Sequence, residues 1–455
     1  MEKTDGSQRV RCLFGTDGVR DVANRGSMTP EMALRLGRAY VLFLTERGEP
    51  RPKIVVGRDT RRSGLMLENA LTAGMTSAGA EVVRLGVLPT PAVSLAVAAF
   101  GAQGGGIISA SHNPPEYNGI KFLNGAGQKL RDSDELAIED YLGDELIDDW
   151  RPTGASVGEI LSDNSFAVEY AEHSLSVLAG DDLSNMKIVF DCANGAQSVV
   201  MEPFLRRLKC RALIIGHKPN GLNINEKSGV MHLETLKNAV KESGFDLGIA
   251  FDGDADRVLM VDRLGRVIDG DVILWVLGTW LKREDLLGSG VVATVMSNGA
   301  LECQLSKEDI QVFRCAVGDR YVLDMMRSTA SRLGGEQSGH VIIDAFTKTG
   351  DGLCTAMAFL RACREMGWQT TGLSDEFHPF PQRLVNICVA DRDRAMESPA
   401  VKSAVDQANR DLGTSGRVLL RASGTEPLIR LLVECDDPDQ LLQTSQVLEK
   451  LIREA

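Results

Sequence analysis

The segment IVVGRDTRRSG, residues 54–64, joins a short apolar run to a turn of small and polar residues. The same pattern recurs as IVFDCANGAQS from Ile188 and as VVATVMSNGAL from Val291. A run of β-branched residues that ends in such a turn is typical of a parallel strand in an α/β unit. Its recurrence along the chain indicates an internal repeat of three related domains.

Short apolar runs alternate with longer periodic segments elsewhere in the chain as well. This alternation predicts parallel strands at residues 53–57, 81–86, 105–110, 187–191, 247–251 and 291–296. The C-terminal part differs, because an alternating strand at 428–434 precedes a helix at 439–454 with leucines at helical spacing. That combination predicts a small α+β domain.

Three stretches are candidate domain boundaries: the polar residues 150–158, the turn near Arg257, and residues 367–381, which contain glycine and proline. A length of 455 residues suits three or four domains. The predicted fold class is therefore α/β, with three related α/β domains followed by a small C-terminal α+β domain. The predicted domains are residues 1–154, 155–257, 258–370 and 371–455.

The composition favours a packed globular protein with small-molecule partners. Hydrophobic residues make up 43% of the chain and charged residues 25%, which is the ordinary balance for such a fold. The formal net charge of −13 repels nucleic acid and anionic membranes, so we expect neither as a partner. A phosphate ligand would need a local basic pocket.

Several features of the sequence predict a cytoplasmic protein. The nine cysteines are odd in number and include no Cys-x-x-Cys pair, which is typical of reduced thiols inside a cell. Residues 1–14 are polar and lack the apolar core of a signal peptide. The apolar runs 87–100 and 271–281 are too short to span a bilayer.

The first motif that carries chemistry is GIISASHNPPEYNGIKF, residues 106–122. Its apolar run ends abruptly in Ser-His-Asn-Pro, so the hydroxyl of Ser111 is displayed at the carboxyl end of a strand. Open α/β sheets bind ligands there, and a displayed serine is a candidate nucleophile. The alternative is that Ser109, Ser111 and Asn113 are ordinary turn formers.

The second motif, FDGDADR at residues 251–257, places Asp252, Asp254 and Asp256 directly after an apolar strand. Two carboxylates about 4 Å apart repel by about 4 kcal/mol at an effective dielectric constant near 20, so three converging ones call for a cation. Oxygen ligands suit Mg²⁺. A calcium-binding EF-hand loop is excluded, because Arg257 and Arg263 stand where it needs glycine and glutamate. A solvated acidic turn remains the alternative.

Two further motifs offer polar groups on loops. GGEQSGH, residues 334–340, presents a carboxylate, an amide, a hydroxyl and an imidazole, which match the donors and acceptors of a sugar ring. RASGTEPLIR, residues 421–430, places backbone and hydroxyl donors between two arginines, as a site for a dianionic phosphate requires. Ordinary loop composition and a plain turn before a strand are the respective alternatives.

These motifs together resemble the α-D-phosphohexomutase superfamily. The resemblance is carried, in this order, by FGTDGVR from Phe14, ISASHNPPEYNGIKF from Ile108, DGDADR from Asp252, GEQSGH from Gly335 and RASGTEP from Arg421. Within the superfamily it is strongest to the branch that acts on glucosamine phosphates, because of VGDRY from Val317, TGDG from Thr349 and PQRLVN from Pro381. It extends from residue 14 to near the C-terminus.

The resemblance implies four domains around one central cleft, each of which supplies one loop. Ser111 would be phosphorylated, and Asp252, Asp254 and Asp256 would hold Mg²⁺ together with that phosphate. Arg20 and Arg257 would clamp the phosphoserine, while Lys121 and His340 are the candidates for moving the hydroxyl proton. The substrate-binding residues implied are Glu336 and Ser338 for sugar hydroxyls, Arg320, and the distal phosphate loop of Arg421, Ser423, Gly424, Thr425 and Arg430.

The reaction implied is exchange of a phosphoryl group between C6 and C1 of glucosamine through a bisphosphorylated sugar. A glucosamine or glucose 1,6-bisphosphate would prime the enzyme, and the product would supply the synthesis of UDP-N-acetylglucosamine, a peptidoglycan precursor. The expected partner is a sugar phosphate, and the candidate assembly is a homodimer.

Three other functions compete with this one. A phosphomannomutase or phosphoglucomutase would use the same chemistry on a neutral hexose. A non-catalytic sugar-phosphate binding protein could retain the fold, although Ser111, the three aspartates and both arginines of the last loop are all intact. A phosphatase could hydrolyse through the same phosphoserine. One departure concerns Asp21, which stands where the resemblance leads us to expect glycine, so a turn with positive φ would be strained there.

Overall fold

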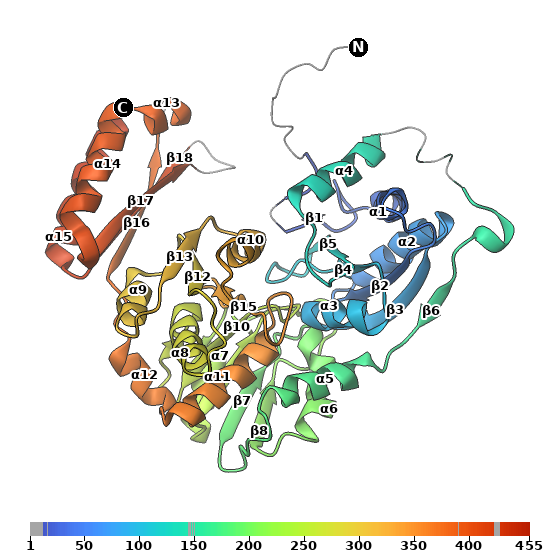
Figure 1. Ribbon diagram of the computed structural model, residues 1–455, viewed down its shortest axis with the longest axis horizontal. Coiled ribbons are helices and arrows are strands. Elements are labelled where there is room, and N and C mark those ends of the chain that lie inside the picture. Colours follow the sequence, from blue (N-terminus) through green and yellow to red (C-terminus); the bar gives the residue numbers. More distant parts are fainter. Residues whose placement is uncertain are drawn as a thin grey trace.

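The computed structural model describes residues 12–15, 17–143, 147, 149, 151–389, 391–422 and 428–455. It contains three mixed sheets flanked by helices and one small antiparallel sheet. The units follow one another along an arc, from the blue N-terminal unit to the red C-terminal one (Figure 1). The predicted fold class is confirmed.

The N-terminal unit is built on a six-stranded sheet of order β1-β5-β4-β2-β3-β6. Ile54 and Val56 of β2 pack on the face covered by α1 and α2, whereas Val55 packs on the face of α3. This alternation is what a strand buried on both faces requires. The elements are β1 (Val19–Val22), β2 (Lys53–Arg58), β3 (Glu81–Val87), β4 (Gly104–Ile108), β5 (Tyr117–Asn124), β6 (Ile160–Ser162), α1 (Pro30–Glu46), α2 (Gly64–Ser77), α3 (Thr90–Ala99) and α4 (Asp132–Gly143).

The second unit is a five-stranded sheet of order β11-β10-β9-β7-β8. Its central strands β7 and β9 are almost completely buried, in agreement with their apolar sequences. The elements are β7 (Lys187–Asp191), β8 (Arg211–Ile215), β9 (Leu247–Phe251), β10 (Val258–Asp262), β11 (Val267–Ile268), α5 (Phe166–Ser176), α6 (Met201–Leu205) and α7 (Glu234–Ser243).

The third unit is a four-stranded sheet of order β13-β12-β14-β15. The helix α8 is buried along nearly its whole length. Asp269 is its N-cap, and the side chain of Asp269 accepts hydrogen bonds from the first turn. The elements are β12 (Val291–Thr294), β13 (Val312–Cys315), β14 (Leu333–Gly335), β15 (Val341–Ile343), α8 (Gly270–Arg283), α9 (Gly299–Ser306), α10 (Asp319–Thr329), α11 (Gly352–Met366) and α12 (Thr370–Glu376).

The three sheets share the order of four strands, which confirms the internal repeat predicted from the sequence. In each sheet the strand that carries the repeated segment, β2, β7 or β12, lies between two parallel neighbours. A fourth strand, β5, β10 or β15, then adds in the antiparallel direction. The loops after equivalent strands therefore occupy equivalent places in the three units.

The predicted domain limits stay predictions, but the strand pairing bears on two of them. β6 pairs with β3 of the first sheet, beyond the limit predicted at residue 154. β10 and β11 extend the second sheet past Arg257, where another limit was predicted. The pairing favours limits after Ser162 and after Ile268.

The C-terminal unit is an antiparallel sheet of order β16-β18-β17 backed by α14 and α15. Pro438 and the side chain of Asp437, which accepts from Asp439 N at 2.9 Å, start α15 where the sequence predicted a helix. The elements are β16 (Gln382–Cys388), β17 (Gly416–Ala422), β18 (Leu428–Cys435), α13 (Arg392–Glu397), α14 (Pro399–Leu412) and α15 (Pro438–Glu454).

Hydrogen bonds tie the C-terminal unit to α9 of the third unit. Asn298 Nδ2 donates to Phe380 O at 3.0 Å, and Phe380 N donates back to Asn298 Oδ1 at 2.9 Å. Gly299 N donates to Oε1 of the buried Glu434 at 2.8 Å, and Arg417 pairs with the same carboxylate. The attachment is polar and local, at one end of the arc (Figure 1).

Asp271, in the first turn of α8, belongs to the same region. Its Oδ2 accepts from Asn298 N at 2.8 Å, and its side chain is completely buried. Burial and the charge of Asp269 raise the pKa of Asp271 to about 7.

The substitution Asp271→Asn is expected to raise the thermal unfolding midpoint more at pH 8 than at pH 5. The two increases should differ by roughly 5 °C. A carboxyl group with a raised pKa in the folded protein contributes stability below its ordinary value of 3.8, and this contribution is lost as the pH rises through about 7. The amide does not titrate, so it avoids the loss. Differential scanning calorimetry at both pH values measures the effect, and equal shifts would contradict it.

Two further sequence predictions meet the structure here. No helix in the described part of the chain is both long and apolar enough to cross a membrane. The thiols of Cys192, Cys315, Cys354, Cys363 and Cys435 are buried and free.

Candidate active site

Ser111 lies just beyond the carboxyl end of β4, where the sequence predicted a displayed hydroxyl. Its φ of 51° lies in the left-handed region that non-glycine residues rarely adopt, and its side chain is buried. Ser111 Oγ donates a hydrogen bond to Asp252 Oδ2 at 2.5 Å. The structure thus brings together two predicted site residues from different sheets.

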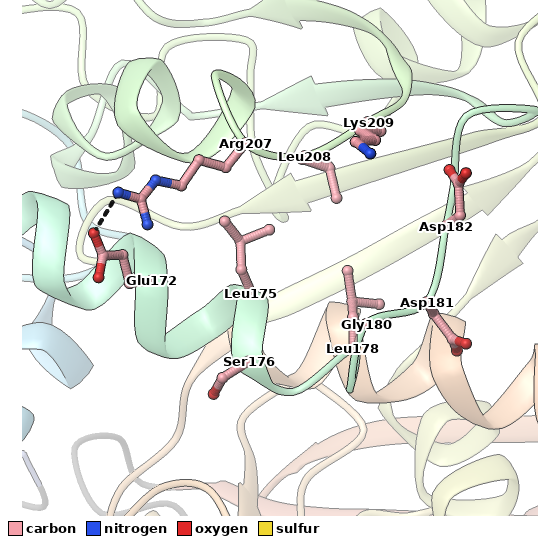
Figure 2. Close-up of a pocket in the computed structure, with 10 residues that line it drawn as sticks. All are labelled: Glu172, Leu175, Ser176, Leu178, Gly180, Asp181, Asp182, Arg207, Leu208 and Lys209. Atoms are coloured by element: carbon pink, nitrogen blue, oxygen red, sulfur yellow. Dashed lines mark ion pairs between the residues drawn. The ribbon is translucent and has the colours of Figure 1, made fainter.

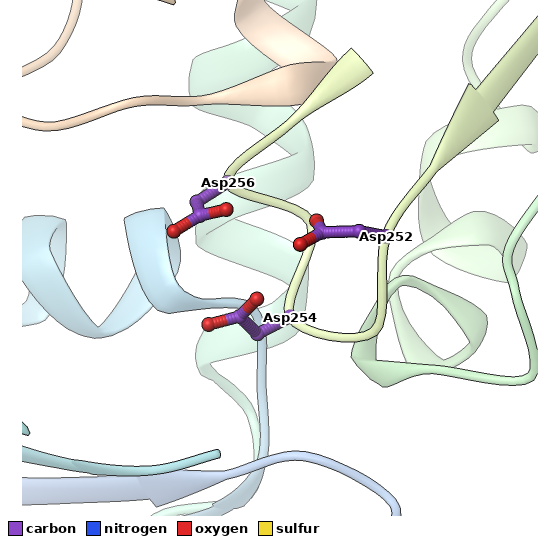
Figure 3. A group of neighbouring side chains, drawn as sticks. All are labelled: Asp252, Asp254 and Asp256. Carbon is purple, nitrogen blue, oxygen red and sulfur yellow. The ribbon is translucent and has the colours of Figure 1, made fainter. Parts of the chain in front are cut away.

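The three predicted aspartates lie on the loop between β9 and β10, and Figure 3 shows their carboxylates turned toward one another. One oxygen atom from each lies within 4.8 Å of the others. The Oδ1 atoms of Asp254 and Asp256 are buried and accept no hydrogen bond from a described residue. Buried, unpartnered carboxylate oxygens of this kind fit a metal ion.

The loop that carries the aspartates packs closely against the serine loop, the segment between β4 and β5 that contains Ser111. A Cβ at Gly253 would lie 2.5 Å from Ser111 O, so this close approach requires glycine. Thr90, at the start of α3, fixes Asp254 from the other side, because its Oγ1 donates to Asp254 Oδ2 at 2.6 Å. The geometry depends on elements of two units.

The aspartates differ in their electrostatic surroundings. Burial and the charges of Asp256 and Asp254 raise the pKa of Asp252 well above its usual range. Burial also opposes the ionisation of Asp254, but the charge of Lys121 and the hydrogen bond from Thr90 outweigh it and hold its pKa below the usual range. A bound cation would relieve the repulsion at Asp252.

Lys121, on β5, stands among carboxylates. Its Nζ lies 3.0 Å from Asp17 Oδ2 and 3.3 Å from Asp254 Oδ2, and the side chain is buried. Burial would lower the pKa of Lys121, but Asp17 and Asp254 more than compensate and raise it. Lys121 is therefore held as a cation. Arg20, on β1, pairs with Asp17 as well.

Arg257 and His112 lie next to the side chain of Ser111. Arg257 Nη1 is 3.2 Å from His112 Nδ1, and His112 Nδ1 is 3.4 Å from Ser111 Oγ. Burial, together with the charges of Arg257 and Arg20, lowers the pKa of His112 to about 4. Near neutral pH the imidazole is uncharged.

The motif GGEQSGH, residues 334–340, was predicted to bind the sugar ring. Its Glu336 and His340 line a cavity of about 150 Å³ together with Arg257 and Asp256. Glu336 Oε1 accepts from Gly318 N at 3.0 Å, and Glu336 Oε2 accepts from Ser338 Oγ at 3.1 Å. His340 is buried, and neither of its ring nitrogens forms a hydrogen bond with a described residue. The cavity is lined by Asp17, Lys129, Asp256, Arg257, Val317, Gly318, Asp319, Glu336 and His340.

Other predicted site residues are not brought to this cavity. Arg320 pairs with Asp132 and, at 3.3 Å, with Glu135 of α4, and it donates to Gly15 O at 3.2 Å. Arg421 and Arg430 face each other on β17 and β18 of the C-terminal unit. Their neighbours Ser423, Gly424 and Thr425 lie outside the described residues.

Asp21 does not strain the chain in the way that the sequence suggested. It belongs to β1, opposite Asn118 of β5, and is therefore extended. Its carboxylate accepts from Val22 N at 2.7 Å and from Ser27 N at 2.9 Å. Arg20 is held in the same strand.

The structure adds residues that sequence reasoning missed. Lys129 pairs with Asp17 and with Asp319, and all three line the cavity. Asp17 and Asp319 are part of the quoted motifs FGTDGVR and VGDRY, so a signal for them was present. Lys129 and Thr90 lie in no motif, and their roles follow from the packing of distant segments.

A larger cavity, of about 670 Å³, lies on the second unit between α5 and the segment after α6 (Figure 2). Arg207 and Glu172 form an ion pair of 2.8 Å at its rim, and both side chains are largely exposed. None of the predicted site residues lines it. Size alone therefore does not locate the site, and the converging charged groups around Ser111 do.

Comparison with protein families matches four parts of the chain to phosphoglucomutase/phosphomannomutase domains. The alpha/beta/alpha domains I, II and III match residues 11–146, 168–265 and 269–380, and the C-terminal domain matches residues 384–450. The sequence resemblance to the phosphohexomutases is confirmed.

Solved structures share the fold over nearly the whole chain. A phosphoglucomutase/phosphomannomutase family protein from Burkholderia thailandensis has a TM-score of 0.79 at 22% identity, covering 96% of this chain and 97% of its own. The N-acetylphosphoglucosamine mutase of Aspergillus fumigatus, solved with GlcNAc-6P and magnesium, has a TM-score of 0.67 at 17% identity, covering 97% and 96%.

Curated relatives are closer in sequence. The phosphoglucosamine mutase of Geobacillus kaustophilus is 44% identical over 92% of this chain and 94% of its own, and that of Desulforamulus reducens is 45% identical over 94% and 96%. The phosphoglucosamine mutase of Clostridium botulinum is 42% identical over 97% and 98%. The chain therefore belongs to the phosphoglucomutase/phosphomannomutase family and, within it, to the phosphoglucosamine mutases.

Proposed function

We propose that this protein interconverts glucosamine 6-phosphate and glucosamine 1-phosphate through phosphorylated Ser111. The observation that carries the proposal is the 2.5 Å hydrogen bond between Ser111 Oγ and Asp252 Oδ2, beside two further buried carboxylates. A buried serine held against an acidic metal-type site suits phosphoryl transfer better than structural packing.

In the proposed reaction, the phosphoryl group leaves Ser111 Oγ for a free hydroxyl of the sugar phosphate. The bond from phosphorus to the serine oxygen breaks and a bond to the sugar oxygen forms. The hydroxyl proton of the sugar passes to a base, and the released serine oxygen takes up a proton, so that Ser111 returns as a free hydroxyl. The resulting bisphosphate turns within the site and returns its other phosphoryl group to Ser111. An added hexose 1,6-bisphosphate phosphorylates unmodified Ser111 by this second transfer, from the sugar to the serine.

We propose Mg²⁺ as the ion that fits Asp252, Asp254 and Asp256. When bound, it would supply positive charge next to the phosphoryl oxygens. The support comes from the donor set, which consists of oxygen atoms, and from the unpartnered Oδ1 atoms of Asp254 and Asp256. The raised pKa of Asp252 indicates that the three charges are not balanced by the described residues alone.

Cationic side chains supply the remaining charge stabilisation. The guanidinium of Arg257 lies beside His112, next to Ser111. Lys121 pairs with Asp254, whereas Arg20 pairs with Asp17. Fixed positive groups lower the barrier for a transferring phosphoryl group because its oxygens carry the developing charge. Lys121 suits this role better than that of proton acceptor, since its raised pKa keeps it protonated.

His340 is the better candidate for the proton. It lines the cavity with Glu336, its ring nitrogens form no hydrogen bond with a described residue, and its Nε2 lies 3.6 Å from Asp319 Oδ2. Glu336 and Ser338, which hydrogen-bond to each other, would accept and donate to sugar hydroxyls. We further propose that the enzyme acts in the cytoplasm on a sugar phosphate; the homodimer remains a prediction.

The decisive experiment is conversion of glucosamine 6-phosphate by the purified protein with Mg²⁺ and glucose 1,6-bisphosphate, beside glucose and mannose phosphates. Rapid formation of glucosamine 1-phosphate, much slower turnover of the neutral sugars and no release of inorganic phosphate are the expected results. Preference for a neutral hexose would reassign the substrate, and phosphate release in place of isomerisation would reveal a phosphatase.

The substitution Arg421→Ala is expected to raise KM for both isomers by about 10- to 100-fold, because it removes a charge-assisted phosphate contact. Both isomers are affected because the distal loop would hold whichever phosphate is not reacting. Steady-state kinetics in both directions measure the effect. Arg410→Ala, on α14 of the same unit, is the control, since Arg410 bonds to Gln407 on its own exposed helix surface. A change confined to one isomer would contradict the prediction.

A further inference from the structure

The backbone of the serine loop is gripped by one buried arginine. Arg61 follows β2, and its side chain is fully buried. Its Nη2 donates to Ser111 O at 3.0 Å and to Asn113 O at 2.8 Å, and its Nη1 donates to Tyr117 O at 3.0 Å and to Pro114 O. Four carbonyl groups of residues 111–117 are thus held by one guanidinium.

Asp59 completes this arrangement. Arg61 Nε donates to Asp59 Oδ2 at 2.9 Å, so each of the five guanidinium N–H groups has an acceptor. The same Oδ2 accepts from Ser109 Oγ at 2.7 Å, and Ser109 Oγ accepts from Ser111 N at 2.9 Å. The N–H and the C=O of Ser111 are therefore both fixed by the Asp59–Arg61 pair.

The second unit contributes to the same grip. Asn225 Nδ2 donates to Ser111 O at 2.9 Å and to Asn113 O at 3.0 Å. Asn225 is itself anchored, because its N–H donates to Ala193 O at 2.8 Å. The serine loop is consequently held between two units, one of which also carries the aspartates.

We propose that Arg61 is a positioning residue for phosphoryl transfer, acting with Asp59 and Asn225. It holds Ser111 in the left-handed conformation that presents Oγ to Asp252, without itself touching the reacting atoms. A lysine cannot replace it, since a single ammonium group has three donors and no fork. The inference rests on the phosphoserine function proposed above.

The test is Arg61→Lys, with the rate at which glucose 1,6-bisphosphate phosphorylates Ser111 measured by quenched-flow mass spectrometry. We expect this rate and kcat to fall by about 30- to 100-fold, because a loosely held nucleophile is less often in the reactive geometry. KM for glucosamine 6-phosphate should stay within about threefold, since Glu336, Ser338 and the distal loop are unchanged. A purely structural role would instead lower the fraction of active enzyme and leave the rate per active site unchanged.

Arg84→Lys is the matched control. Arg84 lies on β3, which pairs with the strand β2 that precedes Arg61. Its guanidinium donates to the side chains of Glu68 and Asn69 rather than to the serine loop. It should retain wild-type rates. If Arg61→Lys does not fold, Asn225→Ala is the variant that tests the proposal. It removes two hydrogen bonds to the carbonyls of Ser111 and Asn113 and should lower the phosphorylation rate by about fivefold or more.

Two outcomes separate this inference from the function on which it rests. If the wild-type protein is not phosphorylated on Ser111 by the bisphosphate, the proposed function and the inference both fail. If the wild-type protein is phosphorylated and turns over, but folded Arg61→Lys, or folded Asn225→Ala in its place, keeps the wild-type rate, the inference alone is overturned.

Discussion

The substitution Ser111→Ala is expected to lower kcat by at least about 1,000-fold, because it removes the atom to which the phosphoryl group is attached in every cycle. The loss should be the same with glucosamine 6-phosphate and glucosamine 1-phosphate as substrate. Added glucose 1,6-bisphosphate should not restore activity, since no acceptor for priming remains. Coupled assays in both directions, and intact-mass analysis after incubation with the bisphosphate, measure the two effects.

The fold should survive this substitution. The backbone O and N of Ser111 keep their hydrogen bonds, and the lost Oγ contacts are those to Asp252 and His112, so alanine leaves the other contacts of the loop in place. Ser306→Ala is the control, because Ser306 is exposed on α9 and bonds to Cys303 O of its own helix. Retention of more than a few per cent of the wild-type rate by Ser111→Ala would show that another group carries the phosphoryl.

The elements of the fold could be predicted where local sequence decides them. The strands at 187–191 and 247–251 agree with β7 and β9, because uniformly apolar runs bounded by turns have few alternatives. The strand predicted at 105–110 ends earlier, at Ile108, since Ser109 and Ser111 use their polar groups to shape the loop.

The limit between the second and third units is difficult to predict from a local motif. The acidic motif at 251–257 reads as the end of a domain, yet it is the turn between β9 and β10 of one sheet. The pairing of β10 with β9 depends on contacts that no local pattern encodes. The limit predicted at residue 257 therefore stays a prediction, and the pairing favours a limit after Ile268.

The candidate site divides in the same way. Ser111, the aspartates and Glu336 lie in compact motifs whose residue types already indicate phosphate, metal and sugar chemistry. Arg61, Asn225 and Lys129 instead contact segments far away in the chain, as Asn225 Nδ2 contacts Ser111 O across 114 positions. Arginines and lysines are common on surfaces, so the sequence alone does not single out Arg61 or Lys129. Their importance follows from the burial of Arg61 and from the ion pairs of Lys129.

The proposed metal site gives the second prediction with a large expected effect. Saturating MgCl₂ is expected to raise the thermal unfolding midpoint of the wild-type protein, because a bound cation offsets the repulsion among three buried carboxylates. Two such charges about 4 Å apart repel by about 4 kcal/mol at an effective dielectric constant near 20. Treatment with EDTA should reverse the shift and abolish turnover, and both should return when Mg²⁺ is added back.

The substitution Asp256→Asn tests two expected effects of the Asp256 charge, namely repulsion of the other carboxylates without metal and binding of Mg²⁺ when it is added. Without metal, the variant should unfold at a higher temperature than the wild-type protein, because one of the repelling charges is gone. With Mg²⁺, its midpoint should move less, and its kcat should fall by at least about 100-fold, since a carboxylate that faces the cavity has been lost. Asp309→Asn, the same change at an exposed turn whose φ of 51° asparagine tolerates, is the control. An Asp256→Asn variant that keeps the full Mg²⁺-dependent shift would mean that the ion binds elsewhere, and the acidic loop would then require another explanation for its buried, unpartnered oxygens.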